Sequence, residues 1–291
     1  MQGSLTEPQS SGQYTYEHAL LIDTRSRAAT SAKGGSWQRH LISGMVPMLC
    51  LYILYTLVRF IVRDRGPASG IAHAYDVLRL ERFLRIDWEI DIQTFALPHH
   101  WLIVAANWYY VIGFLPVVVV SGSVSAILDF RSFIWWRKRF ALTLLLALIG
   151  FAFYPLAPPR MLPGMVDTLM DYGPRYYGDS HGSSFFNAFG RIPSMVNVYA
   201  AMPSMHVAWS IIAGVLIIGA FQHRWWSFGI GIGHPICMAI AVVVTANHYL
   251  LDVIIGVIAL GVAMVILHFL DRRHGPSPAR PPGTLHDAAV A

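Results

Sequence analysis

A histidine and an aspartate stand four residues apart where a long apolar stretch begins. His248 and Asp252 precede the run from Val253 to Leu270. Positions i and i+4 lie on one face of a helix, so this spacing predicts that the two side chains meet. A carboxylate at the centre of a bilayer costs about 2.5–3.5 kcal/mol and is by default a candidate for function. An aspartate that accepts a hydrogen bond from one ring nitrogen leaves the other nitrogen free as a base, a nucleophile or a metal ligand.

A second histidine and an arginine stand at the ends of other apolar stretches. His206 follows Pro203 at the start of one stretch, and Arg160 follows a proline-rich turn at the end of another. The planar fork of an arginine matches two phosphate oxygens. Proline suits the first turn of a helix, so we expect unpaired amides, which form an anion site, near Ser204, Met205 and His206. With two histidines present, one could attack phosphorus while the other protonates the departing oxygen.

The composition indicates a membrane protein. Of the 291 residues, 55% are hydrophobic and 13% are charged, and the mean hydropathy is +0.49. Soluble domains carry about 25% charged residues. Because several apolar runs approach the ~20 residues that a span needs, we expect an all-α polytopic membrane protein with six transmembrane helices. The predicted spans cover about residues 41–62, 101–120, 140–154, 202–221, 226–245 and 248–270.

The segments outside the predicted spans differ in composition from the membrane core, which we place at residues 41–270. Residues 1–40 are rich in Ser, Gly, Thr and Gln, and residues 271–291 are polar and rich in Pro, so both predict disordered tails. Residues 67–98 alternate apolar and charged side chains, which predicts interfacial amphipathic helices before the second span. We expect a break near Asp87, which would N-cap the second of these helices.

The basic residues predict the orientation. The linker between the second and third spans holds Arg131, Arg137, Lys138 and Arg139 with almost no acid, so it is expected in the cytoplasm. Both termini then lie in the cytoplasm, and residues 156–200 form an outer loop at the site. By this rule the starts of the fourth and sixth spans meet the end of the third at the outer face. The two histidines, the arginine and the aspartate therefore converge.

Other sequence features limit the classes of partner. The net charge of +5 comes from arginines scattered around the spans, which favours a role in orientation over nucleic-acid binding. Cys50 and Cys237 lie within apolar runs, and the chain has no CxxC metal motif. We therefore expect no cofactor, no nucleic acid and no protein partner.

The motifs resemble those of a known family. Pro203-Ser204-Met205-His206 resembles the second motif of the type-2 phosphatidic acid phosphatase superfamily, whose usual form is Pro-Ser-x-His. His248-x-x-x-Asp252 resembles the end of its third motif, and the resemblance covers roughly residues 101–270. It implies a metal-independent phosphohistidine mechanism in which His248 is the nucleophile, Asp252 its orienter and His206 the acid. It also implies that the phosphoryl oxygens are held by Arg160, Ser204 and Met205.

Two departures from the usual motifs point to one branch of that superfamily. Ala241 and Val242 stand where the third motif usually has Ser-Arg, so one phosphate arginine is missing. Arg175 or Arg191 in the outer loop is the candidate substitute. Asn247 is a further candidate contact, unless it only N-caps the sixth span. The second departure is in the first motif, which usually places a Lys well before an Arg-Pro, whereas the local sequence here is Ala157-Pro158-Pro159-Arg160. That variant, together with Asn247-His248-Tyr249, looks more like the inositol phosphorylceramide synthase branch, which moves a phospho-alcohol headgroup onto a lipid hydroxyl.

The favoured prediction is therefore headgroup phosphotransfer. The donor would be a phospholipid, with a phosphoinositide as the favoured case, and the acceptor a lipid alcohol. The enzyme would lie in a plasma membrane, which we expect to be bacterial, with its site on the extracytoplasmic side. The alternative is hydrolysis of a lipid phosphate or a polyprenyl pyrophosphate, because water and an alcohol need the same base and the same phosphohistidine.

Two further alternatives lie outside this chemistry. His206, His248 and Asp252 form a two-histidine, one-carboxylate set that resembles iron or zinc ligation, although Arg160 suits an anion better than a cation. A histidine and a carboxylate within the membrane could also be a proton relay in a transporter, or belong to a non-catalytic scaffold. Against the relay, the polar groups gather at one side of the membrane rather than along a path.

Overall fold

The computed structural model describes five parts of the chain. These are residues 46–60 except 48, 52 and 59, and residues 66–128, 130–171, 199–221 and 224–273. All of them belong to one compact unit, Val46–Ala291. The predicted tail at residues 1–40 lies outside the described residues, as do the candidates Arg175 and Arg191.

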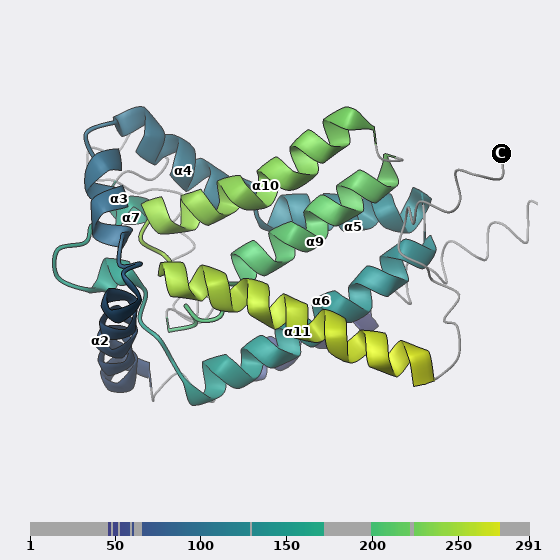
Figure 1. Cartoon of the computed structure of the whole chain (residues 1–291), viewed down its shortest axis with the longest axis horizontal. Coiled ribbons are helices and arrows are strands. Elements are labelled where there is room, and N and C mark those ends of the chain that lie inside the picture. Colours follow the sequence, from purple (N-terminus) through teal and green to yellow (C-terminus); the bar gives the residue numbers. More distant parts are fainter. Residues whose placement is uncertain are drawn as a thin grey trace, which may run out of the picture. The chain divides into compact units, whose positions relative to one another are not determined.

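The described residues are helical, as the composition predicts. Apart from one isolated bridge between Leu156 and Ala200, they form helices and the turns that join them. From Gly66 onward these are α2 (Gly66–Leu84), α3 (Glu89–Ala96), α4 (His100–Ile112), α5 (Leu115–Leu128), α6 (Phe130–Phe153), the 3-10 turn η2 (Pro159–Met161), α7 (Thr168–Asp171), α9 (Met205–Ala220), α10 (Trp225–Val244) and α11 (Leu250–Arg273) (Figure 1).

Two of these helices, α10 and α11, are long and apolar enough to cross a membrane. The pair α4 and α5 passes the same test as one span bent by 44°. Leu49–Val58 and α9 are shorter apolar helices. The described residues therefore carry two candidate spans, or three with the bent pair, which indicates an integral membrane protein but does not reach the six predicted spans.

The second predicted span, residues 101–120, is broken into two helices. Helix α4 ends at Ile112, and α5 starts at Leu115 in a new direction. Pro116 lies in the first turn of α5, where its missing N–H leaves no hydrogen bond unmade, so a new helix can start there. The bend places Tyr110 and Phe114 beside the ring of His206.

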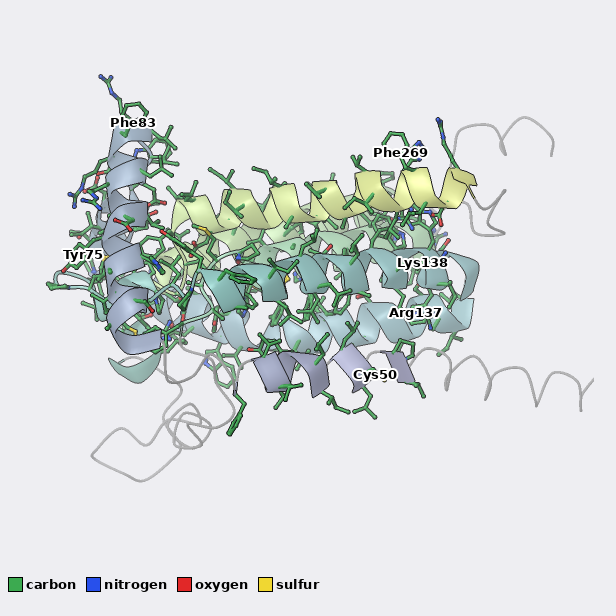
Figure 2. All side chains as sticks on the ribbon, turned by 90° about the horizontal axis from the view of Figure 1, so that it is seen from below. Cys50, Tyr75, Phe83, Arg137, Lys138 and Phe269 are labelled. Carbon is green, nitrogen blue, oxygen red and sulfur yellow. The ribbon has the colours of Figure 1, made fainter. Side chains whose placement is uncertain are left out.

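The third span, predicted at residues 140–154, begins earlier in the chain than the prediction places it. Helix α6 begins at Phe130 and includes the basic residues assigned to a linker. Arg139 is 2% exposed, because its guanidinium lies over the Trp135 ring and donates from Nη2 to Asp271 Oδ2 at 3.2 Å. Lys138 donates to the other oxygen of Asp271 at 3.3 Å. A long-range ion pair thus lets the helix extend into the basic segment, at the end of the bundle away from α2 (Figure 2).

The charged segment at residues 67–98 forms two helices, α2 and α3, as predicted. Helix α2 runs across the end of the bundle rather than along it (Figures 1 and 2), and Phe83 on it is 82% exposed. The break between the helices lies at residues 85–88, but Asp87 does not cap α3. Trp88 occupies the N-cap position, with no hydrogen bond from its side chain.

Helix α9 packs at the centre of the bundle. Its buried residues join those of α6 and α11 in one apolar cluster and those of α10 in another. A Cβ on Gly214 would lie 2.1 Å from the backbone oxygen of Gly231, so α9 and α10 touch backbone to backbone. Small residues permit such close approach between membrane helices. This packing fixes the starts of α9 and α11, which carry the motif histidines.

Candidate active site

The predicted contact between His248 and Asp252 is present. Asp252 Oδ2 accepts a hydrogen bond from His248 Nδ1 at 3.3 Å and another from the Tyr249 amide at 3.0 Å. The amide of His248 donates to the Val242 carbonyl at 3.1 Å, which ties the turn before α11 to the end of α10. Both side chains are buried, Asp252 completely. With Nδ1 protonated toward the carboxylate, His248 Nε2 carries a lone pair.

The second histidine lies within hydrogen-bond distance of the His248 Nε2 lone pair. His206 lies in the first turn of α9, and its Nδ1 is 3.2 Å from His248 Nε2. Its ring packs against Tyr110 and Phe114, with ring centroids 4.6 and 4.1 Å away. Carboxylate, first histidine and second histidine therefore form one hydrogen-bonded line, in which His206 donates and His248 accepts.

The start of α9 differs from the expected row of free amides. The Ser204 amide donates to the Asp252 carbonyl at 3.0 Å, so it is already paired. The amides of Met205 and His206, in the first helical turn, have no acceptor within the helix. Two other buried atoms here lack a hydrogen-bond partner among the described residues, Ser204 Oγ and Asp252 Oδ1. Unpaired polar groups therefore remain beside the histidines.

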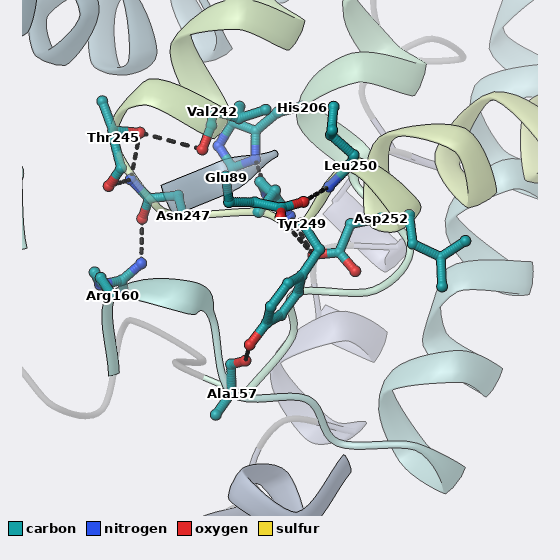
Figure 3. A network of polar contacts seen from close by, with 12 residues as sticks. Glu89, Ala157, Arg160, His206, Val242, Thr245, Asn247, Tyr249, Leu250 and Asp252 are labelled. Carbon is teal, nitrogen blue, oxygen red and sulfur yellow. Dashed lines mark hydrogen bonds and ion pairs between the residues drawn. The ribbon is translucent and has the colours of Figure 1, made fainter. Parts of the chain in front are cut away.

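Arg160 lies next to the turn that carries His248. Its amide donates to the Ala246 carbonyl at 2.9 Å, and its Nη1 donates to Asn247 Oδ1 (Figure 3). Its Nε pairs with Asp167 Oδ2 at 3.2 Å. Asn247 does not cap the sixth span, which starts at Leu250. Its amide nitrogen donates instead to Thr245 Oγ1 at 2.7 Å, and its oxygen orients the arginine.

Two amide side chains hold the segment that carries Asp167. Gln93 on α3 donates to the Val166 carbonyl at 2.9 Å and accepts from the Val166 amide at 2.8 Å. Asn107 on α4 donates to the Thr168 carbonyl at 2.7 Å. Both amides are buried, and a reciprocal pair of hydrogen bonds fixes the backbone that it contacts. The acidic partner of the arginine is therefore held in place from two helices.

Two glutamates that the sequence analysis did not single out cap the start of α11. The Leu250 amide donates to Glu89 Oε1 at 2.7 Å (Figure 3), and the Leu251 amide donates to Glu81 Oε1 at 2.8 Å. Both glutamates are buried, at 3% and 0% exposure. Burial, and next the charge of Glu89, raise the pKa of Glu81 to about 9. Burial also raises the pKa of Glu89, while the Leu250 amide opposes that shift.

The two residues that stand where the third motif usually has Ser-Arg are buried in the helix packing. Ala241 and Val242 are buried in α10, and the Val242 carbonyl accepts the amides of Asn247 and His248. In the described part of the chain, no group of three or more His, Cys, Asp or Glu side chains is arranged to hold a metal ion. The two histidines and the aspartate lie in a line rather than around one point.

The arrangement matches the needs of phosphoryl chemistry. A nitrogen lone pair backed by a carboxylate can attack an electrophile, and an adjacent histidine in its protonated form can give a proton to a leaving oxygen. Arg160 and the first amides of α9 can bind the oxygens of an anion.

Comparisons with known proteins agree with this chemistry. The family model described as the PAP2 superfamily matches residues 75–266, which include every described motif residue. Comparisons with the curated proteins and with the solved structures found no match.

Proposed function

The chain belongs to the PAP2 superfamily, whose enzymes are typically metal-independent phosphatases or phosphotransferases, and we propose that it transfers a phospho-alcohol headgroup between membrane lipids. The observation that carries the proposal is the line from Asp252 through His248 to His206, with contacts of 3.3 and 3.2 Å. The proposed donor is a phospholipid such as a phosphoinositide, and the proposed acceptor is a lipid alcohol.

The reaction proceeds in two displacements at phosphorus. In the first, His248 Nε2 forms a bond to phosphorus while the bond to the diacylglycerol oxygen breaks. His206, protonated on both ring nitrogens at this step, gives one proton to that oxygen and becomes neutral, and Asp252 balances the positive charge that develops on the His248 ring. In the second, the acceptor hydroxyl loses its proton to His206 and attacks phosphorus, and His248 leaves unchanged. Because the donor oxygen must lie between the two rings, substrate entry separates the two nitrogens.

The remaining residues bind the phosphoryl oxygens. Arg160 offers a fork to two oxygens once it releases Asp167 or Asn247. The amides of Met205 and His206 add the positive end of α9. The unpaired hydroxyl of Ser204 is a third donor. Together these donors stabilise the phosphoryl charge, which an arginine in place of Ala241 or Val242 would otherwise help to stabilise.

Two observations favour transfer to a lipid alcohol over transfer to water. Tyr110 and Phe114 form an aromatic wall against His206, where the acceptor must lie to lose its proton. Such a wall suits the apolar body of a lipid alcohol. The sequence around Arg160 and His248 resembles the branch that transfers headgroups. The proposed orientation places this site on the extracytoplasmic side, with both termini in the cytoplasm.

The experiment supplies a donor labelled in its headgroup and separates the products. Purified full-length protein in vesicles receives phosphatidylinositol labelled in the inositol, together with a ceramide or diacylglycerol acceptor that carries a different acyl chain. We expect label on the new lipid, none with His248→Ala, and normal transfer with His99→Ala, which replaces an exposed histidine. Label released as free inositol phosphate would favour hydrolysis instead. No labelled product from this donor, with or without the acceptor, would contradict the proposal.

A further inference from the structure

The start of α11 is held by carboxyl groups from three helices. Asp252 accepts the Tyr249 amide, Glu89 on α3 accepts the Leu250 amide, and Glu81 on α2 accepts the Leu251 amide. The first amides of a helix have no partner within the helix. Here they are satisfied in sequence order by three separate carboxyl groups, two of them from outside α11. His248 stands directly before these amides, so its backbone position depends on them.

The two glutamates must lie side by side. They accept hydrogen bonds from consecutive amides of one helical turn, and both are almost completely buried. Two carboxylates this close cannot both ionise in a buried site, so such a pair holds one proton between them. The second oxygen of Glu81, Oε2, is buried without a hydrogen-bond partner among the described residues. An unpaired buried carboxylate oxygen is costly when charged, which favours the proton on Glu81, from where it can be donated to the neighbouring Glu89 carboxylate.

We propose that Glu81 and Glu89 are positioning residues for His248, and that as a pair sharing one proton they fix the first turn of α11 with a single negative charge. The proposal rests on the proposed function, because it serves the nucleophile of that reaction. A single charge at this end of α11 is favourable, because the amides carry the positive end of the helix dipole.

The shared proton protects the nucleophile. The charged groups that act on Glu81 are Glu89 from α3 and Asp252 from α11, and both are acidic. The Tyr249 hydroxyl, which donates to the Ala157 carbonyl, is a further ionisable group beside the pair. Loss of the shared proton would therefore place three carboxylates at one helix start. The added negative charge would hold a proton on His248 and remove the lone pair that attacks phosphorus.

The first test detects the shared proton without a substrate. Burial raises the pKa of Glu81 from 4.5 to about 9, so its contribution to stability is complete below pH 4.5 and is lost as the pH rises through about 9. Glu81→Gln mimics the protonated acid and cannot titrate. We expect the Tm of the full-length protein in detergent to fall less in Glu81→Gln than in wild type between about pH 6 and pH 9. Asp91→Asn, which replaces an exposed carboxylate of α3, should follow wild type. Parallel decline of Glu81→Gln and wild type would overturn the shared proton.

The second test detects the positioning role with orthovanadate, a mimic of the phosphoryl transition state. A bound ligand raises Tm by mass action, so the shift at each vanadate concentration reports affinity. We expect Glu81→Ala and Glu89→Ala to weaken vanadate binding by roughly 10- to 100-fold, because each removes a charged or shared acceptor from a buried amide. Glu81→Gln should recover the affinity at neutral pH and keep it above pH 9, where wild type loses it.

The outcomes separate the two proposals. If vanadate does not raise the Tm of the wild-type protein at any pH, the phosphoryl site itself is contradicted. Wild type that binds vanadate, with alanine variants that bind equally well, would overturn only the positioning role. If the alanine variants do not fold, the pH dependence of vanadate binding in Glu81→Gln tests the positioning role instead. An alkaline loss identical to that of wild type would overturn the role.

Discussion

Asp252→Asn separates the charge of the carboxylate from its shape. Oδ2 of Asp252 accepts from both His248 Nδ1 and the Tyr249 amide, whereas Oδ1 has no hydrogen-bond partner in the described part of the chain. The amide oxygen of the variant can therefore occupy the Oδ2 position and keep both hydrogen bonds. The amide nitrogen then takes the unpaired position. The tautomer of His248 is preserved, and only the negative charge is lost.

The magnitude follows from the distance between the charge and the ring. When His248 attacks phosphorus, the ring becomes positive, 3.3 Å from the carboxylate oxygen. Two unit charges at this distance attract by about 5 kcal/mol at an effective dielectric constant of about 20. At about 1.4 kcal/mol for each factor of ten, the loss is roughly 10³- to 10⁴-fold in the rate of phosphoenzyme formation.

The assay compares single turnovers with stability. Purified wild type and Asp252→Asn receive phosphatidylinositol labelled in the phosphate, and label bound to protein is followed in time. Because Asp252 is completely buried, removal of its charge should leave the Tm in detergent unchanged or higher. A rate within tenfold of wild type would refute the electrostatic role of Asp252. A rate loss accompanied by unfolding would refute the claim that the variant keeps the local hydrogen bonds.

Three other perturbations test neighbouring parts of the site. Arg160→Lys should raise KM and slow the reaction by roughly 10- to 100-fold, because an ammonium cannot replace the two-pronged guanidinium; normal kinetics with phosphatidylinositol would contradict this role. Gly256→Ala should destabilise the protein by about 1–3 kcal/mol, because its Cβ would lie 2.5 Å from the Ser204 carbonyl oxygen. Gly261→Ala on the same helix has nothing within 4 Å and should leave Tm unchanged, so equal Tm values for the two variants would refute the close packing. Chelators should leave transfer intact while vanadate inhibits it, and loss of activity on chelation would support the metal alternative.

Local spacing and charge rules predicted the central contacts of the site. The meeting of His248 and Asp252 follows from i,i+4 geometry, which depends on no other part of the chain. The approach of His206 and Arg160 to that pair required the counting of spans and the placement of basic residues. The candidate spans are fewer in the described residues than predicted, yet these side chains converge, because α9 and α11 pack directly on each other at Ser204 and Gly256.

The missed features depend on contacts between distant segments. Glu81 and Glu89 belong to a strongly charged stretch, so the sequence alone indicates a solvated face. Only the packing of α2 and α3 against the start of α11 shows that these two acids are buried. Arg139 is a similar case, because its burial in α6 depends on Asp271 near the end of the chain. For Asn247 the sequence leaves a headgroup contact and a helix cap open, and only the fold shows that its side chain contacts Arg160, from a different segment.

The covalent intermediate on His248 is the central claim, and it can be measured directly. Full-length protein is mixed with phosphatidylinositol labelled in the phosphate, quenched in alkali and digested, and the labelled peptide is identified by mass spectrometry. We predict an acid-labile, base-stable label on the peptide that contains His248, absent in His248→Ala and formed much more slowly in His206→Ala, which lacks the acid for the leaving oxygen. Label retained in His248→Ala, or carried by another residue, would contradict the account.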